Sequence, residues 1–179
     1  PEDSAGPLAN VVVMKIACIG GGPASLYFAL LTKQRLPAAE IDVYEQNRPD
    51  DTFGWGVVFS DETLGTFGAA DPESYAAIRR NFAYWTDIDT FFGGRKVTST
   101  GHGFCGLARV KLLEILHERC RELGVRLHFQ QAVVDLDAAA RDHDLVVAAD
   151  GVNSKVRERF AASFRPHLDW RKCKFAWFG

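Results

Sequence analysis

Three glycines follow a short apolar run in the stretch KIACIGGGPASLYFALL, which extends from Lys15 to Leu31. We expect Gly20 to permit a tight turn, and Gly22, which has no side chain, to let a ligand's pyrophosphate approach the backbone. Pro23 suits the first turn of a helix, because the N–H that it lacks would have no helical partner. The unpaired N–H groups of such a helix start, together with the helix dipole, favour a bound diphosphate.

The complete pattern is G-x-G-x-x-S, because Ser25 stands where the dinucleotide-binding fingerprint has its third glycine. An acid, Glu45, ends the next strand-like stretch, at the distance where a ribose-binding carboxylate belongs. A carboxylate accepts hydrogen bonds from ribose hydroxyls and repels a 2′-phosphate, so the pattern favours FAD or NAD over NADP. The alternatives are a glycine-rich turn without a ligand and a solvated charge at a strand end. The fingerprint alone does not separate FAD from NAD.

A second strand–turn–helix pattern lies in the stretch DLVVAADGVNSKVRERF. Asp150 and Gly151 occupy its turn, and the pattern D-G-x-x-S-x-x-R is completed by Ser154 and Arg157. Taken alone, the stretch is also compatible with an ordinary turn in which Asn153 or Ser154 caps a helix.

Strand-like and helical stretches alternate along the chain, which favours a parallel α/β sheet with crossover helices. The segment from about 52 to 106 fits this alternation less well and reads as an insertion between sheet strands. Within it we expect a long loop with short elements over 48–68 and short strands over 91–104. The strands are expected at 15–19, 41–45, 125–129 and 144–149. Helices are expected at 24–33, from the Asp71 N-cap to about 82, and at 110–123 with Gly124 as C-cap. A further helix should follow the turn at Asp150 and Gly151.

The composition is that of a globular protein, with 47% hydrophobic and 25% charged residues and a formal net charge of -2. The sequence has no Lys/Arg cluster, which argues against a nucleic-acid partner, and no apolar run long enough for a membrane span. The four cysteines are far apart. This spacing favours buried free thiols over metal ligands, and we therefore expect a reducing, cytoplasmic compartment.

The motifs together resemble the class A flavoprotein aromatic hydroxylases, the para-hydroxybenzoate hydroxylase type. The stretches YEQNRPDDTFGWGVVFSDETL, GHGFCGLARVKLLEIL and DLVVAADGVNSKVRERF resemble in particular the branch that hydroxylates salicyloyl-CoA and anthraniloyl-CoA. The resemblance spans Lys15 to Gly179. It implies a Rossmann-like fold and an FAD-dependent monooxygenase that uses NADH or NADPH and O2 to hydroxylate an aromatic substrate, such as an aromatic acyl-CoA.

The resemblance also implies roles for individual residues. Arg109 would face FAD from the start of a helix, and a plain surface charge is its alternative. The Gly54–Gly56 loop would lie near the isoalloxazine, although Trp55 could equally be a core aromatic. The implied cofactor-binding residues are Gly20, Gly22, Pro23 and Ser25 at the pyrophosphate, Glu45 at the adenosine ribose, Arg48 near the adenosine diphosphate, Arg109, and Asp150 with Gly151 at a second flavin contact.

Other conspicuous residues receive no chemical role. We interpret His102 as structural or solvated, and no catalytic residue is identified. The aromatic residues Phe91, Phe92, Trp170 and Trp177 are expected in the core or on a sheet face rather than in a substrate cage.

The family's chains are much longer than this one, and we expect an incomplete enzyme. Residues 1–13 are expected to be a tag or leader, 14–165 a partial FAD-binding domain, and 166–179 the start of a substrate-domain sheet. Such a chain should bind FAD weakly or not at all and should not turn over. The competing interpretations are an NAD-binding module of a dehydrogenase and a non-catalytic fragment.

Overall fold

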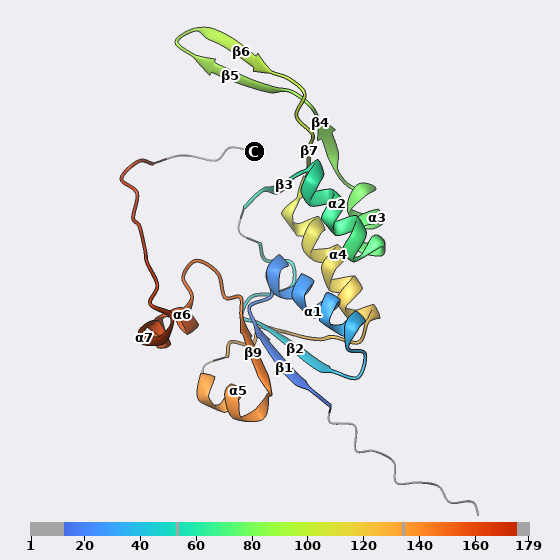
Figure 1. Ribbon diagram of the computed structural model, residues 1–179, viewed down its shortest axis with the longest axis vertical. Helices are drawn as coiled ribbons and strands as arrows, with labels where there is room; N and C mark the ends of the chain where they lie inside the picture. The colour runs from blue at the N-terminus through green and yellow to red at the C-terminus, as the bar shows by residue number, and fades with distance from the viewer. Residues whose placement is uncertain (1–12, 53, 134, 175–179) are drawn as a thin grey trace, which may run out of the picture.

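A four-stranded parallel sheet forms the base of the molecule in the computed structural model, which describes residues 13–52, 54–133 and 135–174 (Figure 1). Its strand order is β8-β2-β1-β9, and every neighbouring pair is parallel. This confirms the predicted fold class. The strands are β1 (Lys15–Ile19), β2 (Glu40–Glu45), β8 (Arg126–Phe129) and β9 (Leu145–Ala148).

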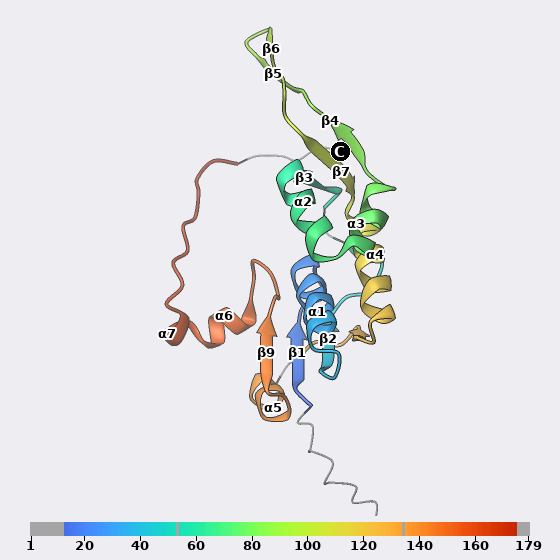
Figure 2. The ribbon, with the colours of Figure 1, turned by 45° about the vertical axis from the view of Figure 1, so that its right-hand side comes forward.

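Two long helices pack together over one face of this sheet, α1 (Pro23–Arg35) and α4 (Arg109–Glu122) (Figure 2). Ile41 and Val43 of β2 point into the core beneath them, as their alternation predicts. On α4 the inward positions are Leu112, Leu116 and Cys120, spaced four residues apart so that they share one face of the helix. The helix ends before Gly124, whose φ of 81° is the left-handed conformation expected of a C-cap glycine.

Three short helices flank β9 along the chain. The α5 helix (Leu136–Asp142) precedes the strand, and α6 (Lys155–Arg159) and α7 (Ala161–Phe164) follow it. The sequence analysis did not predict α5, which has no buried residue and therefore no apolar stripe to reveal it. Its start is fixed locally instead, since the Asp135 carboxylate accepts the N–H of Ala138 at 2.9 Å.

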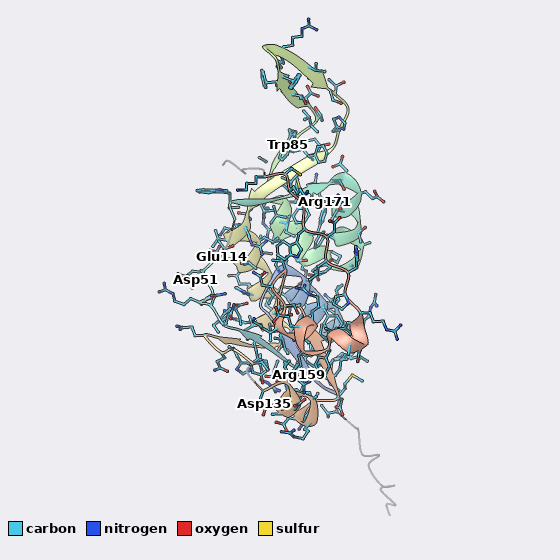
Figure 3. All side chains as sticks on the ribbon, turned by 90° about the vertical axis from the view of Figure 1, so that its left-hand side faces the viewer. Asp51, Trp85, Glu114, Asp135, Arg159 and Arg171 are labelled. Atoms are coloured by element: carbon cyan, nitrogen blue, oxygen red, sulfur yellow. The ribbon has the colours of Figure 1, made fainter. Side chains whose placement is uncertain are left out.

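The predicted insertion forms a layer of its own beyond the helices. A three-stranded antiparallel sheet has the order β3-β7-β4, and a separate hairpin, β5–β6, projects from it as an arm, with Trp85 at its base (Figures 1 and 3). The elements are β3 (Gly56–Ser60), α2 (Asp61–Ala70), α3 (Pro72–Arg79), β4 (Ala83–Trp85), β5 (Ile88–Phe92), β6 (Arg95–Ser99) and β7 (Phe104–Ala108).

Two predictions, one for this layer and one for exposed aromatic residues, hold only in part. The expected long loop with short elements over 48–68 contains the short strand β3, as predicted, but also most of the ten-residue α2, whose start is capped by Ser60 accepting the N–H of Thr63 at 3.3 Å. Phe91 and Phe92, expected in the core or on a sheet face, lie on strand β5 and are exposed, at 74% and 86%, so the sheet face holds and the core does not. Trp170 is 85% exposed, and Trp177 lies outside the described residues.

A buried carboxylate ties the insertion to the helix layer. Asp71, 1% exposed, caps α3 through the N–H of Ser74 and forms an ion pair with Arg119 of α4 at 3.1 Å. The Gln34 amide of α1 also donates to Asp71, at 2.6 Å. Burial raises the pKa of the Asp71 carboxyl, but the bonds from Ser74, Arg119 and Gln34 outweigh it and hold the pKa below its usual value. These partners compensate the desolvation of a buried charge.

The cysteine and terminal predictions have mixed outcomes. Cys18, Cys105 and Cys120 are buried free thiols, whereas Cys173 is exposed. Burial raises the pKa of Cys18 to about 11 and that of Cys120 to about 12. Residues 166–174 contain neither helix nor strand, and 1–12 and 175–179 lie outside the described residues, so the predicted leader and substrate sheet stay predictions. Among the described helices, none combines the length and apolar character that crossing a membrane requires.

Candidate functional site

The turn after β1 has the backbone that the sequence predicts. Gly20 has a φ of 99°, and a Cβ there would lie 2.4 Å from the carbonyl oxygen of Ala149. Only glycine fits such a position. The Gly20 N–H donates to the Tyr44 carbonyl at 2.8 Å, which fixes the turn to the end of β2. At Gly22, by contrast, a Cβ would meet no atom within 4 Å, so the approach to the backbone is open.

Glu45 reaches this turn directly. Its Oε2 accepts the N–H of Gly21 at 2.7 Å, and its Oε1 accepts both the backbone N–H and the side-chain amide of Asn47, at 2.8 and 2.7 Å. A Cβ on Gly21 would lie 2.8 Å from the Glu45 Cβ. The sequence analysis assigned a role to the first and third glycines of the turn but none to Gly21, because its requirement arises from contact with a residue 24 positions away.

The first turn of α1 offers unpaired donors. Gly22 is its N-cap, no side chain of the described residues caps it, and no acidic residue lies in its first turn. The backbone N–H groups and the positive end of the helix dipole are therefore available to an external anion.

A cleft lies between this turn, the end of β2 and the start of α4. Of the predicted cofactor-binding residues, it brings together Gly22, Glu45, Arg48 and Arg109. Further lining residues that the sequence analysis did not identify are Gly21, Asn47, Thr52, Leu113, His117 and Phe129.

Three polar atoms in the lining of this cleft are buried without a hydrogen-bond partner among the described residues: Thr52 Oγ1, Arg109 Nε and His117 Nε2. Buried polar groups are nearly always paired in folded proteins, and each unpaired one costs about 1–3 kcal/mol. Their concentration around one cleft fits a polar ligand that would supply the missing partners.

The two arginines differ in how firmly they are held. Arg109 is half-buried, and its backbone N–H donates to the Trp55 carbonyl at 3.2 Å. Arg48 is exposed and forms an ion pair with Asp51 at 3.6 Å on the rim of the cleft. Asp51 lies on the same side of the molecule as Glu114 of α4 and away from Asp135 (Figure 3). Trp55 is 68% exposed, which excludes the alternative of a core aromatic.

Other predicted residues lie beside the cleft. Ser25 is fully buried, in keeping with the close helix–strand contact expected at the third position of the fingerprint. Pro23 lines a neighbouring apolar cavity together with Tyr27 and Phe59. His102 has a partner in the Ser99 hydroxyl, 2.6 Å from its Nε2, and does not line the cleft.

Asp150 and Gly151 form the turn after β9, next to Gly20. The Asp150 carboxylate accepts the Ser154 hydroxyl at 2.6 Å and the N–H groups of Lys155 and Val156 at 2.7 and 3.3 Å. Burial raises the pKa of Asp150, but these bonds outweigh it and leave the pKa below its ordinary value. Ser154 is the N-cap of α6, accepting the Arg157 N–H at 3.0 Å, as one of the sequence alternatives proposed.

His117 is the cleft residue that differs most from its expected chemistry. It is 4% exposed, and its ring meets Phe129 edge-on, with centroids 5.0 Å apart. Burial, aided by the positive charge of Arg121, lowers the pKa of His117 to about 4, so the imidazole is neutral at pH 7. A usable signal was present in the sequence: His117 lies eight residues after Arg109 and therefore on nearly the same helix face.

Comparisons with known proteins give three sequence relatives, all named as hydroxylases or monooxygenases. Salicyloyl-CoA 5-hydroxylase of a Streptomyces species is 47% identical over 93% of this chain and 32% of its own length. Protodeoxyviolaceinate monooxygenase of Chromobacterium violaceum is 36% identical over 93% of this chain and 45% of its length. A 3-hydroxy-4-methyl-anthranilyl-[aryl-carrier protein] 5-monooxygenase of Streptosporangium sibiricum is 35% identical over 84% of the chain and 42% of its length. The chain thus spans less than half of each relative.

Solved structures share the fold. The tetrameric form of 2-methyl-3-hydroxypyridine-5-carboxylic acid oxygenase matches 82% of this chain and 42% of its own, with a TM-score of 0.71 and 23% identity. The p-nitrophenol 4-monooxygenase of Pseudomonas putida matches 81% of this chain and 42% of its own, with a TM-score of 0.66 and 19% identity. No family model matches the chain.

Proposed function

We propose, on the premise that the chain is a homologue of aromatic monooxygenases, that it holds the adenosine diphosphate half of FAD within an aromatic-hydroxylating enzyme. The observation that carries this proposal is the set of partnerless polar atoms around the uncapped start of α1. An anionic, hydroxyl-bearing ligand satisfies both features, and FAD has both groups in its adenosine diphosphate.

Each part of the cleft suits one part of that ligand. The N–H groups at the start of α1, approached over Gly22, bind the diphosphate. The Arg109 guanidinium stays charged at all working pH values and donates in a planar fork, which suits phosphate oxygens. Arg48 at the rim adds a second positive charge, and Pro23, Ser25, Asp150 and Gly151 shape or flank the turn. Glu45 accepts from the ribose hydroxyls and excludes a 2′-phosphate by charge repulsion.

The oxidation chemistry belongs to the cofactor: when bound, FAD takes electrons from NADH or NADPH and uses O2 to hydroxylate the substrate. The relatives named for salicyloyl-CoA and for an anthranilyl group on a carrier protein suggest an aromatic acyl thioester as the substrate. The buried thiols suit a reducing compartment, and we propose the cytoplasm.

The test is an NMR titration of the isotope-labelled chain with FAD, NAD and NADP, following the backbone amides of Gly21 and Gly22. FAD should shift both amides, and NADP should leave them unchanged because of the Glu45 carboxylate. The variant E45Q, which removes the charge with little change in shape, should admit NADP.

Each other outcome identifies a competing function. Equal or stronger shifts with NAD than with FAD would favour a dehydrogenase module. No shift at millimolar FAD would overturn the proposal in favour of a fragment that folds without a ligand. We also predict weak FAD binding and no NADH consumption when an aromatic acyl-CoA is added to the chain alone; turnover would refute the expectation of an incomplete enzyme.

A further inference from the structure

One face of α4 is turned toward the cleft along its whole first half. Arg109, Leu113 and His117, each four residues after the last, all line the cleft. Leu112, Leu116 and Cys120 face the core, to which Leu113 also belongs, and His117 borders a second pocket as well. At 1.5 Å per residue, His117 lies ~12 Å further along the helix axis than Arg109. The two side chains therefore belong to different parts of the cleft, and a ligand reaching both would be extended along α4.

The surroundings of His117 place it at the Glu45 end of the cleft. Its ring packs on Phe129, the last residue of β8, and β8 pairs with β2 so that Phe129 lies opposite Glu45. Glu45 and His117 both line this cleft. The part of the ligand that Glu45 binds is thus the part within reach of His117.

Nε2 of His117 lacks a partner in the described part of the chain although the side chain is 4% exposed. Phe129 packs beside the ring but offers no hydrogen-bonding group. The aromatic contact with Phe129 holds the ring where His117 lines the cleft, and Nε2 is left without a partner. Without a partner, a group buried this deeply destabilises the fold.

We propose that His117 Nε2 forms a hydrogen bond with a hydroxyl of the adenosine ribose, beside the hydroxyl that Glu45 binds; this inference rests on the proposed function. Chemistry selects the ribose rather than the diphosphate. The imidazole is neutral, because burial lowers its pKa to about 4, and a neutral ring adds no charge attraction to phosphate. A hydroxyl can donate or accept, so it satisfies Nε2 in either tautomer of the ring.

The test compares FAD with FMN, which lacks the adenosine, in the wild type and in H117L and H117Q. Dissociation constants are taken from the quenching of flavin fluorescence. H117L should weaken FAD binding roughly tenfold, as expected for one lost hydrogen bond to a buried group, and should leave FMN binding unchanged. H117Q should retain most of the FAD affinity because its amide donates and accepts.

The ligand can be varied in the same way. Calorimetry with ADP, 2′-deoxy-ADP and 3′-deoxy-ADP should show that the H117L effect disappears for the analogue that lacks the contacted hydroxyl. C120A, on the core face of the same helix, is the matched control: it should lower the thermal unfolding temperature without changing the affinity for ADP.

Several results would overturn the inference. FAD affinity in H117L equal to the wild type, an equal loss for FAD and FMN, or an H117L effect that persists for both deoxy analogues would each do so. If the wild type binds neither FAD nor ADP, the proposed function itself fails, and the inference fails with it. Unfolding temperatures of the ligand-free variants separate a loss of folding from a loss of contact.

Discussion

Two glycine-containing turns lie side by side at the carboxyl ends of β1 and β9, and each leads into a helix. The backbone N–H groups at the two helix starts differ in whether a side chain accepts from them. At the second turn, Asp150 and Ser154 accept the first N–H groups of α6. At the first turn no described side chain caps α1. The second helix start is therefore saturated by the chain's own side chains, whereas the first has no side-chain acceptor among the described residues.

The comparison shows that a strand–turn–helix pattern does not by itself make an anion site. Both turns need a glycine with positive φ, Gly20 at 99° and Gly151 at 82°. The difference lies in the residue at the turn: an aspartate after β9, and glycines before Pro23 after β1. A carboxylate that is already present neutralises the helix dipole and fills the position that a phosphate would take.

The largest expected effect separates the first and third glycines of the first turn, Gly20 and Gly22. G20A should lower the free energy of unfolding by about 3 kcal/mol, because the added Cβ collides with the Ala149 carbonyl at a φ that disfavours side chains. G22A should change stability little, since Gly22 has a φ of -76° and open space around it. It should instead weaken FAD binding. Urea unfolding and FAD titration of both variants check this, and similar stability losses in the two would contradict it.

The next effect concerns His117, which lines the same cleft as the first turn. The pKa of His117 is about 4 in the folded protein, below its ordinary value of 6.5, and the nearby charges are Arg121, Glu114 and Glu45. As the pH falls, the imidazole is protonated in the unfolded chain before it is protonated in the folded one. The stability that the neutral, buried His117 contributes is therefore fully present above about pH 6.5 and is lost progressively between about pH 6.5 and pH 4. The expected loss at pH 5 is about 2 kcal/mol relative to pH 7.

Thermal or urea unfolding of the wild type and H117L at both pH values measures this contribution. In H117L the decrease in the free energy of unfolding between pH 7 and pH 5 should be much smaller. Asp71 and Asp150 do not obscure it, because carboxyls with lowered pKa values lose their stabilisation only below about 3.8. A decline of the same size in H117L would show that another group is responsible.

A smaller effect tests the internal cap of the second turn. D150A removes an acceptor from Ser154 and from two backbone N–H groups, and should cost about 1 kcal/mol of unfolding free energy at pH 7. D150N keeps the side-chain carbonyl as an acceptor and should cost less. Urea unfolding at pH 7 gives both values, and equal stability of D150A and wild type would remove the distinction between the turns.

The smallest stability effect comes from making the first turn like the second. G22D places a carboxylate at the N-cap of α1, where aspartate exceeds glycine by only a few tenths of a kcal/mol. Its effect on FAD affinity should be far greater, because the carboxylate occupies the position of the diphosphate and repels its negative charge. An unaltered FAD affinity in G22D, measured by fluorescence quenching, would show that the anion binds elsewhere.

Much of the scaffold was predictable because its signals are local. The alternation in β2, the four-residue spacing in α4 and the capping residues Asp71 and Gly124 each act within a few positions of the chain. The α2 helix was missed because Gly65 and Gly68 resemble loop residues, and its start depends on the cap of Ser60. The exposure of Phe91 and Phe92 could not be inferred from their type, since it follows from the projection of the β5–β6 arm.

The sequence by itself determined the four strands of the parallel sheet, the helices α1, α3 and α4, the glycine turn after β1 and the carboxylate at the end of β2, since backbone sterics and side-chain periodicity require no distant partner. Only the tertiary structure decided that Gly21 must clear Glu45, that the Asp150 carboxylate accepts the first N–H groups of α6, and that His117 lines the cleft with an Nε2 unpaired among the described residues. The physical reason is that these are contacts or vacancies among residues far apart in the chain, which exist only once the sheet and helices have packed.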